Sequence, residues 1–501
     1  MKLFDLKLKN YIFQENFRSY NFKEFVESFF GYKISEDPKN QSLEKAYFVR
    51  KDYVDFSPLL VPSSSTGLGI HEATVAQDCH VTIVPRNDEI NEEKNDKRFF
   101  ILDLENTLIK VIAKMEYEGV KVNTTLLKKI GDEINERTKF LENQIWTSAG
   151  ENFNINSSQQ TQKILFEKLE IKPIKKIKTG FSVDNETLEK LANKYEIASF
   201  IVEYRHLKKL QSTYIEGLLK TVNPRTGKIH TTYNQIGTAT GRLSSENPNL
   251  QNIPFGDYYS DNIKSSFVTS GSDYELMVAD YSQVELRILA YLSQDKNLVE
   301  TFAQGKDIHA ETAKLIFNTE EITKDQRKKA KTINFGVMYG ISGFGLSKMI
   351  DESPTECIKY IKRFYESYPS VRAFYDQILE NARKNLYVET FFGRRRYIKT
   401  INDSNKNIQE QANREAINAP IQGTCADIIK IAMINIDKYF HKNKLKSKLI
   451  MQVHDELVFE IHKNEKATIA PKIQEIMENI PNFPTNLKVE IGLGNNWKEA
   501  K

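Results

Sequence analysis

Two aspartates carry the residue type that metal-dependent phosphoryl chemistry requires. Asp280 follows the apolar run LMVA, and Asp455 follows the apolar run KLIMQV and one histidine. We therefore expect each carboxylate to lie at the end of a buried strand. Paired carboxylates can hold two divalent ions about 3.5–4 Å apart, which stabilise the attacking and leaving oxygens of an in-line displacement. A strand-end aspartate is more often a turn or cap residue, and that interpretation would apply to either residue alone.

The two aspartates also indicate which neighbouring groups bind the metal ions and which support them. Asp280 and Asp455 are expected to bridge both metal ions, and the backbone carbonyl of Tyr281 is expected to be a further metal ligand. Glu456 is expected to support the metal ligands rather than to bind metal itself.

The segment 327–340 places two cations and then two aromatic rings at four-residue steps: Arg327, Lys331, Phe335 and Tyr339. On a helix that rises 1.5 Å per residue, side chains four residues apart lie about 6 Å apart on nearly one face. Arg327 and Lys331 can then meet the γ- and β-phosphates of a nucleotide, while Phe335 and Tyr339 meet its sugar and base. The competing interpretation is a basic surface helix whose aromatic residues face the core.

Two other strings are rich in side chains that hydrogen-bond to a sugar–phosphate backbone or to minor-groove acceptors. The first is TATGRLSSENPNLQNIP, with the candidates Arg242, Asn249, Gln251 and Asn252. The second begins as a helix with Arg414, Asn418 and Gln422 at four-residue spacing. We expect this helix to be interrupted at Pro420 and to resume after Gly423. A polar loop and a solvated helix face are the competing interpretations.

The bulk composition restricts the class of protein. At 501 residues the chain is long enough for several domains, and its net charge of +4 is nearly balanced, so an electrostatic argument must rest on where the charges lie. Three widely spaced cysteines predict no disulfide framework and a reducing compartment. His71, Cys79 and His80 lie close together but lack a fourth zinc ligand. No apolar run approaches the roughly 18 residues of a membrane span.

Hydrophobic periodicity predicts an α+β protein. A helix is expected from Leu102 to a stop at Gly119, then a second long amphipathic helix, and a helix start near Asn156. Strands and helices alternate between about 200 and 300, residues from 306 to about 410 are mainly helical, and the tail returns to strand–helix–strand. A lysine group near residue 175 is by itself more often a solvated face than a phosphate contact.

Taken together, these strings resemble family A DNA polymerases, the group of bacterial DNA polymerase I. DYSQVELR is similar to the first palm motif, RKKAKTINFGVMYG to the nucleotide-binding helix of the fingers, and QVHDEL to the last palm motif; FFGRRRY and VEIGLGNNWKEAK also match family text. The resemblance implies a right-hand polymerase fold with an antiparallel palm sheet, helical fingers and a helical thumb. The expected domains are 1–97 (N-terminal domain), 98–200 (thumb), 201–305 (first part of the palm), 306–410 (fingers) and 411–501 (second part of the palm).

The resemblance also implies roles for individual residues. Asp280, Asp455 and Lys331 are the expected catalytic residues, and Glu285 would block the 2′-hydroxyl of a ribonucleotide. The expected nucleotide-binding residues are Arg327, Lys331, Phe335, Tyr339, His309, Glu285 and Gln283. The expected DNA-binding residues are Arg242, Asn249, Gln251, Asn252, Lys208, Arg414, Asn418, Gln422, His454, Lys175, Lys176 and Lys178.

We therefore expect a template-directed DNA polymerase, a nucleotidyltransferase that extends a primer 3′-OH with dNTPs on primer–template DNA. Two Mg²⁺ ions are the expected cofactor, and Mn²⁺ can substitute. The expected setting is DNA replication or repair, by a monomer without membrane contact, in the cytoplasm (nucleoid-associated, or a host cytoplasm if phage-encoded).

Proofreading is not expected. The one string similar to an exonuclease acidic set, Asp103-Leu-Glu105, falls inside text that resembles the start of the thumb, and no 5′ nuclease is expected either. For residues 1–97 two interpretations stay open: a degenerate exonuclease remnant, or a module that docks replication proteins.

Three other classes of protein share part of this pattern. A single-subunit RNA polymerase shares the finger string and both aspartates but should lack Glu285 as a gate. A reverse-transcriptase-like enzyme should show a Tyr-x-Asp-Asp hairpin, which this sequence lacks. A catalytically dead nucleic-acid-binding protein should not retain Asp280, Asp455, Lys331 and Arg327 together.

Overall fold

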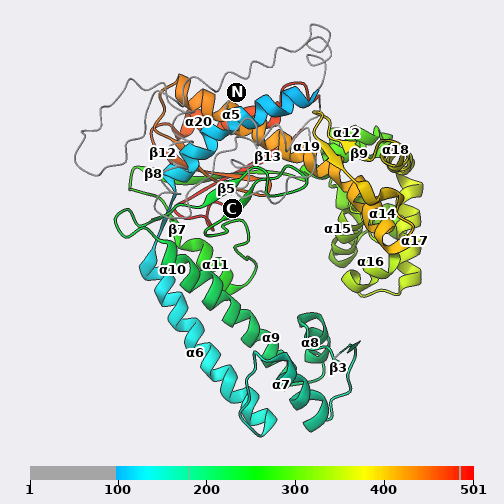
Figure 1. The fold of residues 1–501 in the computed structure, drawn as a ribbon. Coiled ribbons are helices and arrows are strands. Elements are labelled where there is room, and N and C mark those ends of the chain that lie inside the picture. The colour runs from blue at the N-terminus through cyan, green and yellow to red at the C-terminus, as the bar shows by residue number, and fades with distance from the viewer. Residues whose placement is uncertain (1–96, 179, 485–486) are drawn as a thin grey trace, which may run out of the picture. The chain divides into compact units, whose positions relative to one another are not determined.

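A computed structural model describes residues 97–178, 180–484 and 487–501 (Figure 1). The predicted N-terminal domain lies outside the described residues except for Lys97, and so does the group of His71, Cys79 and His80. The chain divides into two compact units. The first comprises the described part of residues 1–110, Gln235–Arg242 and Glu285–Ile431; the second comprises Val111–Asn234, Leu243–Val284 and Ala432–Lys501.

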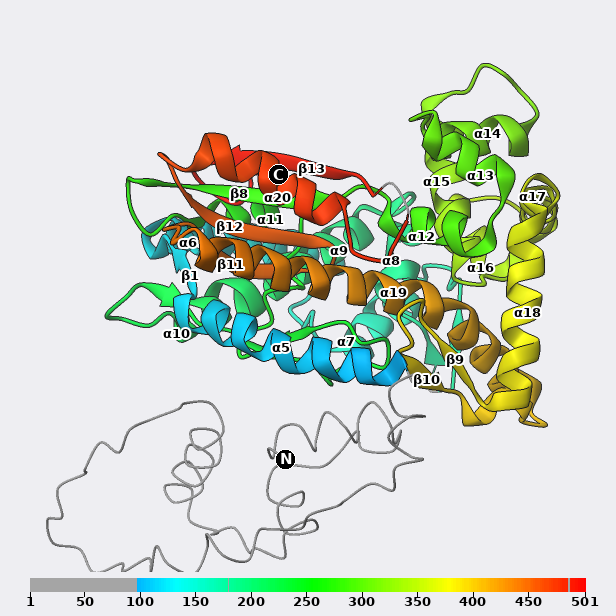
Figure 2. The ribbon, with the colours of Figure 1, turned by 90° about the horizontal axis from the view of Figure 1, so that it is seen from above.

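The second unit contains a four-stranded antiparallel sheet in the order β11-β12-β8-β13. Its strands are β8 (Tyr274–Tyr281), β11 (Lys448–Val453), β12 (Glu456–His462) and β13 (Val489–Gly494), and helix α20 (Lys466–Glu478) lies over them (Figure 2). The apolar run of β8 is buried and the strand is paired on both edges, which explains why its sequence shows no alternation. The predicted strand–helix–strand tail is confirmed.

A helical arm belongs to the same unit. Its elements are α6 (Thr124–Ala149), α7 (Ser158–Gln162), the π-helix η1 (Lys163–Lys168), α8 (Asn185–Ala192), α9 (Glu196–Lys209), the π-helix η2 (Leu210–Glu216) and α10 (Gly217–Thr221). Helix α6 packs on α9, as Figure 1 shows. The Asn123 side chain accepts a hydrogen bond from Leu126 N at the start of α6, and Ser157 caps α7 as the sequence predicts.

Short strands and one further helix complete the second unit. A three-stranded sheet joins β1 (Val120–Val122), β4 (Lys228–Ile229) and β7 (Phe267–Val268), and two hairpins join β2 (Lys176–Ile177) to β3 (Gly180–Phe181) and β5 (Thr232–Asn234) to β6 (Ser244–Glu246). Helix α11 is Tyr258–Ser265.

The first unit is mainly helical, as predicted for residues 306–410. Its elements are α12 (Val284–Ser293), α13 (Lys296–Ala303), α14 (Ile308–Phe317), α15 (Lys324–Met338), α16 (Gly343–Ile350), α17 (Pro354–Ser367), α18 (Pro369–Asn385), the hairpin of β9 (Tyr387–Glu389) and β10 (Arg395–Tyr397), and the 3₁₀ turn η3 (Lys399–Asn402). A reciprocal capping box between Thr323 and Gln326 starts α15.

Two long helices contribute residues to both units: α5 (Lys97–Glu118), which ends before Gly119 as predicted, and α19 (Lys406–Lys442). None of the helices within the described ranges is both long and apolar enough to cross a membrane.

The predicted interruption at Pro420 is wrong, because α19 is one continuous helix of 37 residues. Proline cannot donate the hydrogen bond that the helix would form there. The residues around it are nevertheless buried, including Ala416, Ala419 and Ile421, and the Thr424 hydroxyl donates to the Pro420 carbonyl at 2.6 Å. Burial of this apolar surface outweighs the loss of one backbone hydrogen bond.

Candidate active site

Antiparallel pairing brings the two aspartates together in the second unit. Asp280 lies opposite Glu456 in the register of β8 and β12, and Tyr281 N donates to the Asp455 carbonyl at 3.2 Å in the turn that precedes β12. Burial, and then the neighbouring Asp455 carboxylate, raise the pKa of Asp280 to about 7. The Oδ1 atom of Asp280 is buried and accepts no hydrogen bond from any residue that the structure describes. This oxygen retains its full capacity to bind a ligand.

The acid next to the pair is differently placed. Glu456 is buried, and its carboxylate accepts a hydrogen bond from Trp497 Nε1 at 3.1 Å and forms an ion pair with Lys501. Both Glu456 oxygens are thus engaged by protein groups. Lys501 also lies 3.7 Å from Asp280 Oδ2, so the last residue of the chain reaches the carboxylate pair. No local pattern predicts this contact, because a lysine side chain is normally solvated.

Tyr281 is the last residue of β8, and Gln283 lies in the turn that follows it. The Tyr281 hydroxyl donates to the Met477 carbonyl at 2.8 Å, and Gln283 adopts a φ of +54° just before α12. Their predicted contacts with metal and nucleotide stay predictions.

Helix α15 of the first unit carries the predicted row of cations and aromatics. Arg327 is about half exposed, and its Nε donates to Asp307 Oδ2 at 2.6 Å. Lys331 is exposed and Phe335 is half-buried one and two turns later. Asp307 also caps α14, because its carboxylate accepts hydrogen bonds from the backbone N–H of His309 and Ala310. One carboxylate therefore fixes both the start of α14 and the guanidinium of Arg327.

His309 packs against α15 from the facing helix. Asn334 Nδ2 lies 2.9 Å from His309 Nδ1, and the rings of His309 and Phe335 are 5.7 Å apart. Burial lowers the pKa of His309 to about 4, and Lys331 and Arg327 act in the same direction against Asp307. His309 is therefore neutral at neutral pH.

Glu285 is the buried centre of a second polar group in the first unit. One of its oxygens accepts from Arg242 Nη2 at 2.5 Å, and the other accepts from the Tyr339 hydroxyl at 2.5 Å. Burial, and then the charge of Glu285, raise the pKa of Tyr339, so its hydroxyl keeps its proton and remains a donor. Three residues predicted from separate motifs are thus held together.

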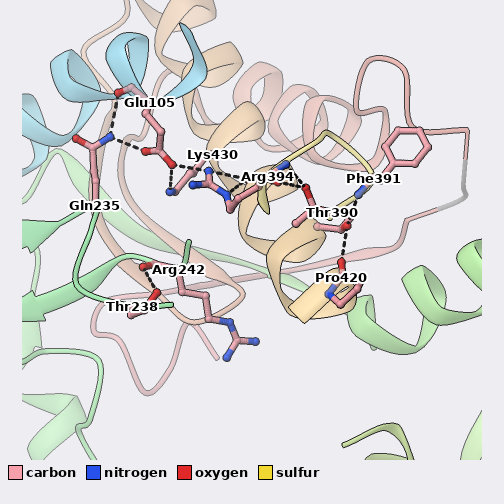
Figure 3. Close-up of polar contacts among 11 residues, drawn as sticks. Glu105, Gln235, Thr238, Arg242, Thr390, Phe391, Arg394, Pro420 and Lys430 are labelled. Atoms are coloured by element: carbon pink, nitrogen blue, oxygen red, sulfur yellow. Dashed lines mark hydrogen bonds and ion pairs between the residues drawn. The ribbon is translucent and has the colours of Figure 1, made fainter. Parts of the chain in front are cut away.

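A buried ion cluster supports the loop that carries Arg242 (Figure 3). Glu105 accepts hydrogen bonds from Arg394 Nη2 and Lys430 Nζ, both at 2.5 Å, and from Gln235 Nε2 at 2.7 Å. Arg394 also pairs with Asp427 Oδ1 at 2.7 Å. All four charged side chains are buried.

The same loop approaches the cluster closely at Gly241, whose φ is +80°. A Cβ at this position would lie 2.5 Å from Arg394 Nε, so glycine is required both by the backbone conformation and by the space. In the sequence Glu105 belongs only to the exonuclease-like string Asp103-Leu-Glu105, and no local pattern predicts its structural role.

The predicted DNA-binding residues near the four-stranded sheet of the second unit differ in solvent exposure. Gln251 is buried and donates to Gln452 Oε1 at 2.9 Å, and Asn249 Oδ1 accepts from the Gln251 backbone N–H. Asn252 and His454 are exposed. Gln251 is therefore held in the interior of the second unit, whereas Asn249, Asn252 and His454 are exposed.

The arm of the second unit carries the predicted lysines. Lys175 is paired with Asp184 at 2.7 Å, and Lys176 and Lys178 are exposed on the same β-hairpin. Lys208 is half-buried on α9, with its Nζ 5.9 Å from the centroid of the Tyr204 ring.

In the first unit, α19 places its three predicted DNA-binding residues one turn apart. Arg414 is exposed and packs beside Gly340, and Asn418 and Gln422 follow on the same face. Asn418 Oδ1 is buried and has no hydrogen-bond partner among the described residues. The helical row is as predicted, although the helix runs through Pro420.

Comparison with known proteins matches this chain to polymerases. Residues 124–499 match the family described as DNA polymerase family A. The chain is 44% identical to DNA polymerase I of Geobacillus stearothermophilus over 83% of this chain and 48% of that protein, and 44% identical to DNA polymerase I of Bacillus subtilis over 82% and 47%. It therefore spans about half the length of these curated relatives.

A solved structure is similar as well. It is described as the POL domain of Pol1 from M. smegmatis in complex with DNA primer-template and dNTP, with a TM-score of 0.76 and 37% sequence identity. The match covers 79% of this chain and 70% of that chain.

Proposed function

This chain belongs to DNA polymerase family A, and on that basis we propose that it is a DNA-directed DNA polymerase that extends a primer 3′-OH with dNTPs. The observation that carries the proposal is the carboxylate pair of Asp280, near the end of β8, and Asp455, in the turn before the adjacent strand β12, with Asp280 Oδ1 buried and unpartnered among the described residues. A buried carboxylate oxygen without a partner is costly, and a bound cation would satisfy it.

The carboxylate pair fits a site for divalent ions such as Mg²⁺. Among the described residues no group of three or more His, Cys, Asp or Glu side chains is arranged to hold a metal ion. Mg²⁺ characteristically uses one or two carboxylates and completes its coordination with substrate phosphates and water, so two aspartates suffice. We assign Asp280 and Asp455 as ligands, with the Tyr281 carbonyl beside them. When bound, two such ions would neutralise charge on the attacking and leaving oxygens.

The nucleotide triphosphate is assigned to α15 and α14 in the first unit. Arg327 and Lys331 lie one helical turn apart and present positive charge to solvent. The Nε of Arg327 donates to Asp307, and its two terminal nitrogens are assigned as the donors to phosphate oxygens. Phe335 is assigned to the sugar and Tyr339 to the templating position.

Selection of deoxyribose is assigned to Glu285. Its side chain is held at both oxygens, by Arg242 and Tyr339, and therefore cannot easily move aside for a 2′-hydroxyl. A rigid buried carboxylate is a better steric barrier than a mobile one, because displacing it would break two charge-assisted hydrogen bonds.

Primer extension with Mg²⁺ tests the proposal directly. Asp280→Asn and Asp455→Asn should each abolish extension while leaving the affinity for primer–template DNA, measured by fluorescence anisotropy, within a few-fold of the unaltered protein. Asp273→Asn is the matched control, because Asp273 is an exposed acid just before the same strand. Extension by either of the first two variants at the unaltered rate would remove the metal assignment.

Two further arms of the same assay separate the alternatives. Extension with rNTPs at least as fast as with dNTPs would favour an RNA polymerase, and failure to extend any template would favour a DNA-binding protein without activity. We also propose that the chain lacks 3′–5′ proofreading. A labelled primer with a mismatched end, incubated with Mg²⁺ but without dNTPs, should keep its length.

A further inference from the structure

The imidazole of His309 is buried between α14 and α15, and its Nδ1 is hydrogen-bonded to a protein side chain. Asn334 Nδ2 lies 2.9 Å from Nδ1, and both side chains are almost fully buried, at 1% and 3% exposure. An amide NH₂ group can only donate, so Nδ1 must be the acceptor. A neutral imidazole that accepts at Nδ1 carries its proton at Nε2.

This tautomer matters because of what a phosphate oxygen requires. Phosphate oxygens accept hydrogen bonds, so a histidine can bind them only through a protonated nitrogen. With the opposite tautomer the free nitrogen would present a lone pair to a polyanion and repel it. Protonation of both nitrogens would solve the problem, but burial of the ring disfavours the imidazolium, as the low pKa of His309 indicates.

We propose that Asn334 is a positioning residue for nucleotide binding, which holds His309 as the Nε2–H tautomer and so makes a neutral histidine a hydrogen-bond donor to the triphosphate. This inference rests on the proposed function and adds to it a residue between Lys331 and Phe335 whose side chain need not touch the nucleotide. Asn334 fixes the tautomer of His309. Phe335 packs beside the imidazole, with the two ring centroids 5.7 Å apart.

The tautomer of His309 can be determined by NMR, independently of enzymatic activity. In protein labelled with ¹⁵N-histidine, long-range ¹H–¹⁵N spectra distinguish a protonated from an unprotonated ring nitrogen, and the chain has only eight histidines to assign. His309→Ala identifies the resonance. We expect Nδ1 to be unprotonated and Nε2 protonated at pH 7, and Asn334→Asp to convert the ring to imidazolium, because a carboxylate accepts where the amide donates. A proton on Nδ1 in the unaltered protein would overturn the inference.

Steady-state kinetics of primer extension tests whether the His309 tautomer affects nucleotide binding. Loss of a hydrogen bond to a charged group corresponds to roughly tenfold in affinity, so Asn334→Leu should raise the KM for dNTP about tenfold with little change in kcat. In a His309→Ala background the same change should have no further effect on KM. An equal rise in both backgrounds would mean that Asn334 acts independently of His309 and would overturn the role.

Thr332→Val on the same helix is the matched control and should leave the KM for dNTP unaltered, since within the described part of the chain its hydroxyl donates to the carbonyl of Lys328 in the same helix. Failure of the unaltered protein to extend any primer would count against the proposed function alone. The tautomer spectra would still decide the Asn334 contact.

Discussion

Replacing Glu105 with Gln is expected to destabilise the first unit strongly, although the change preserves the size and shape of the side chain. Glu105 is fully buried and accepts hydrogen bonds from Arg394, Lys430 and Gln235. Although burial by itself raises the pKa of Glu105, Lys430 and Arg394 outweigh it and hold this pKa below its ordinary value. The carboxylate is therefore charged in the folded protein, and its charge is part of the structure.

The magnitude follows from the charge balance of the cluster. Two acids, Glu105 and Asp427, face two bases, Arg394 and Lys430, so the buried group is neutral. Glu105→Gln leaves one positive charge without compensation in a site that water does not reach. Breaking a buried ion pair in this way costs about 3–5 kcal/mol, whereas removing both partners is often nearly neutral. The double variant Glu105→Gln/Lys430→Met should therefore lose at least about 2 kcal/mol less than the sum of the two single variants.

Hydrogen exchange measured by mass spectrometry is the suitable assay, because a chain with two units need not unfold in a single step. Peptides from Thr390–Arg394 and from the Asp427 region of α19 should exchange faster in Glu105→Gln and recover protection in the double variant. Asp103→Asn on the exposed face of the same helix is the control and should change stability by less than about 0.5 kcal/mol. Additive losses in the double variant would refute the charge-balance argument.

Three other results are expected. Glu285→Ala should reduce discrimination against rNTPs by roughly 10- to 100-fold, as judged by kcat/KM for matched dNTP and rNTP, since a rigid barrier is removed. Because the pKa of His309 falls from 6.5 to about 4 on folding, its contribution to stability is complete above pH 6.5 and is lost as the pH falls toward 4, by about 3 kcal/mol at pH 4. His309→Gln should flatten this part of the pH–stability curve obtained by denaturant titration. Changing both Lys176 and Lys178 to Gln should make the slope of log K for DNA binding against log[salt] less steep by about 1.8. Lys190 belongs to the same arm and is paired with Glu186, so Lys190→Gln should leave the slope unaltered.

Local sequence signals were sufficient wherever the structure depends on neighbours in the chain. Helix α15 could be predicted because its four functional positions repeat every four residues. The two strands that bring Asp280 and Asp455 together could be predicted because a strand buried on both faces appears as an unbroken apolar run. Their approach then follows from antiparallel pairing.

Contacts between distant positions could not be predicted in this way. The partners of Glu105 lie 289 and 325 positions away, so no local pattern marks this acid as a cluster residue. The Lys501 contact with Glu456 likewise depends on how the chain end returns to the sheet. The error at Pro420 has the same origin, because a local breaker is overridden by burial that is visible only in the folded protein.

The buried carboxylates of this protein show how unused hydrogen-bonding capacity locates a ligand site. Both carboxylate oxygens of Glu105 and both of Glu456 are bound by protein donors. Asp280 has a buried oxygen with no partner among the described residues, beside a second acid that raises its pKa. A fold that depended on Asp280 for stability would have placed a donor there, as it does for the other two. One criterion therefore distinguishes Glu105, in the exonuclease-like string, from Asp280, the assigned metal ligand. It is the number of hydrogen-bond donors that the folded chain supplies to each carboxylate.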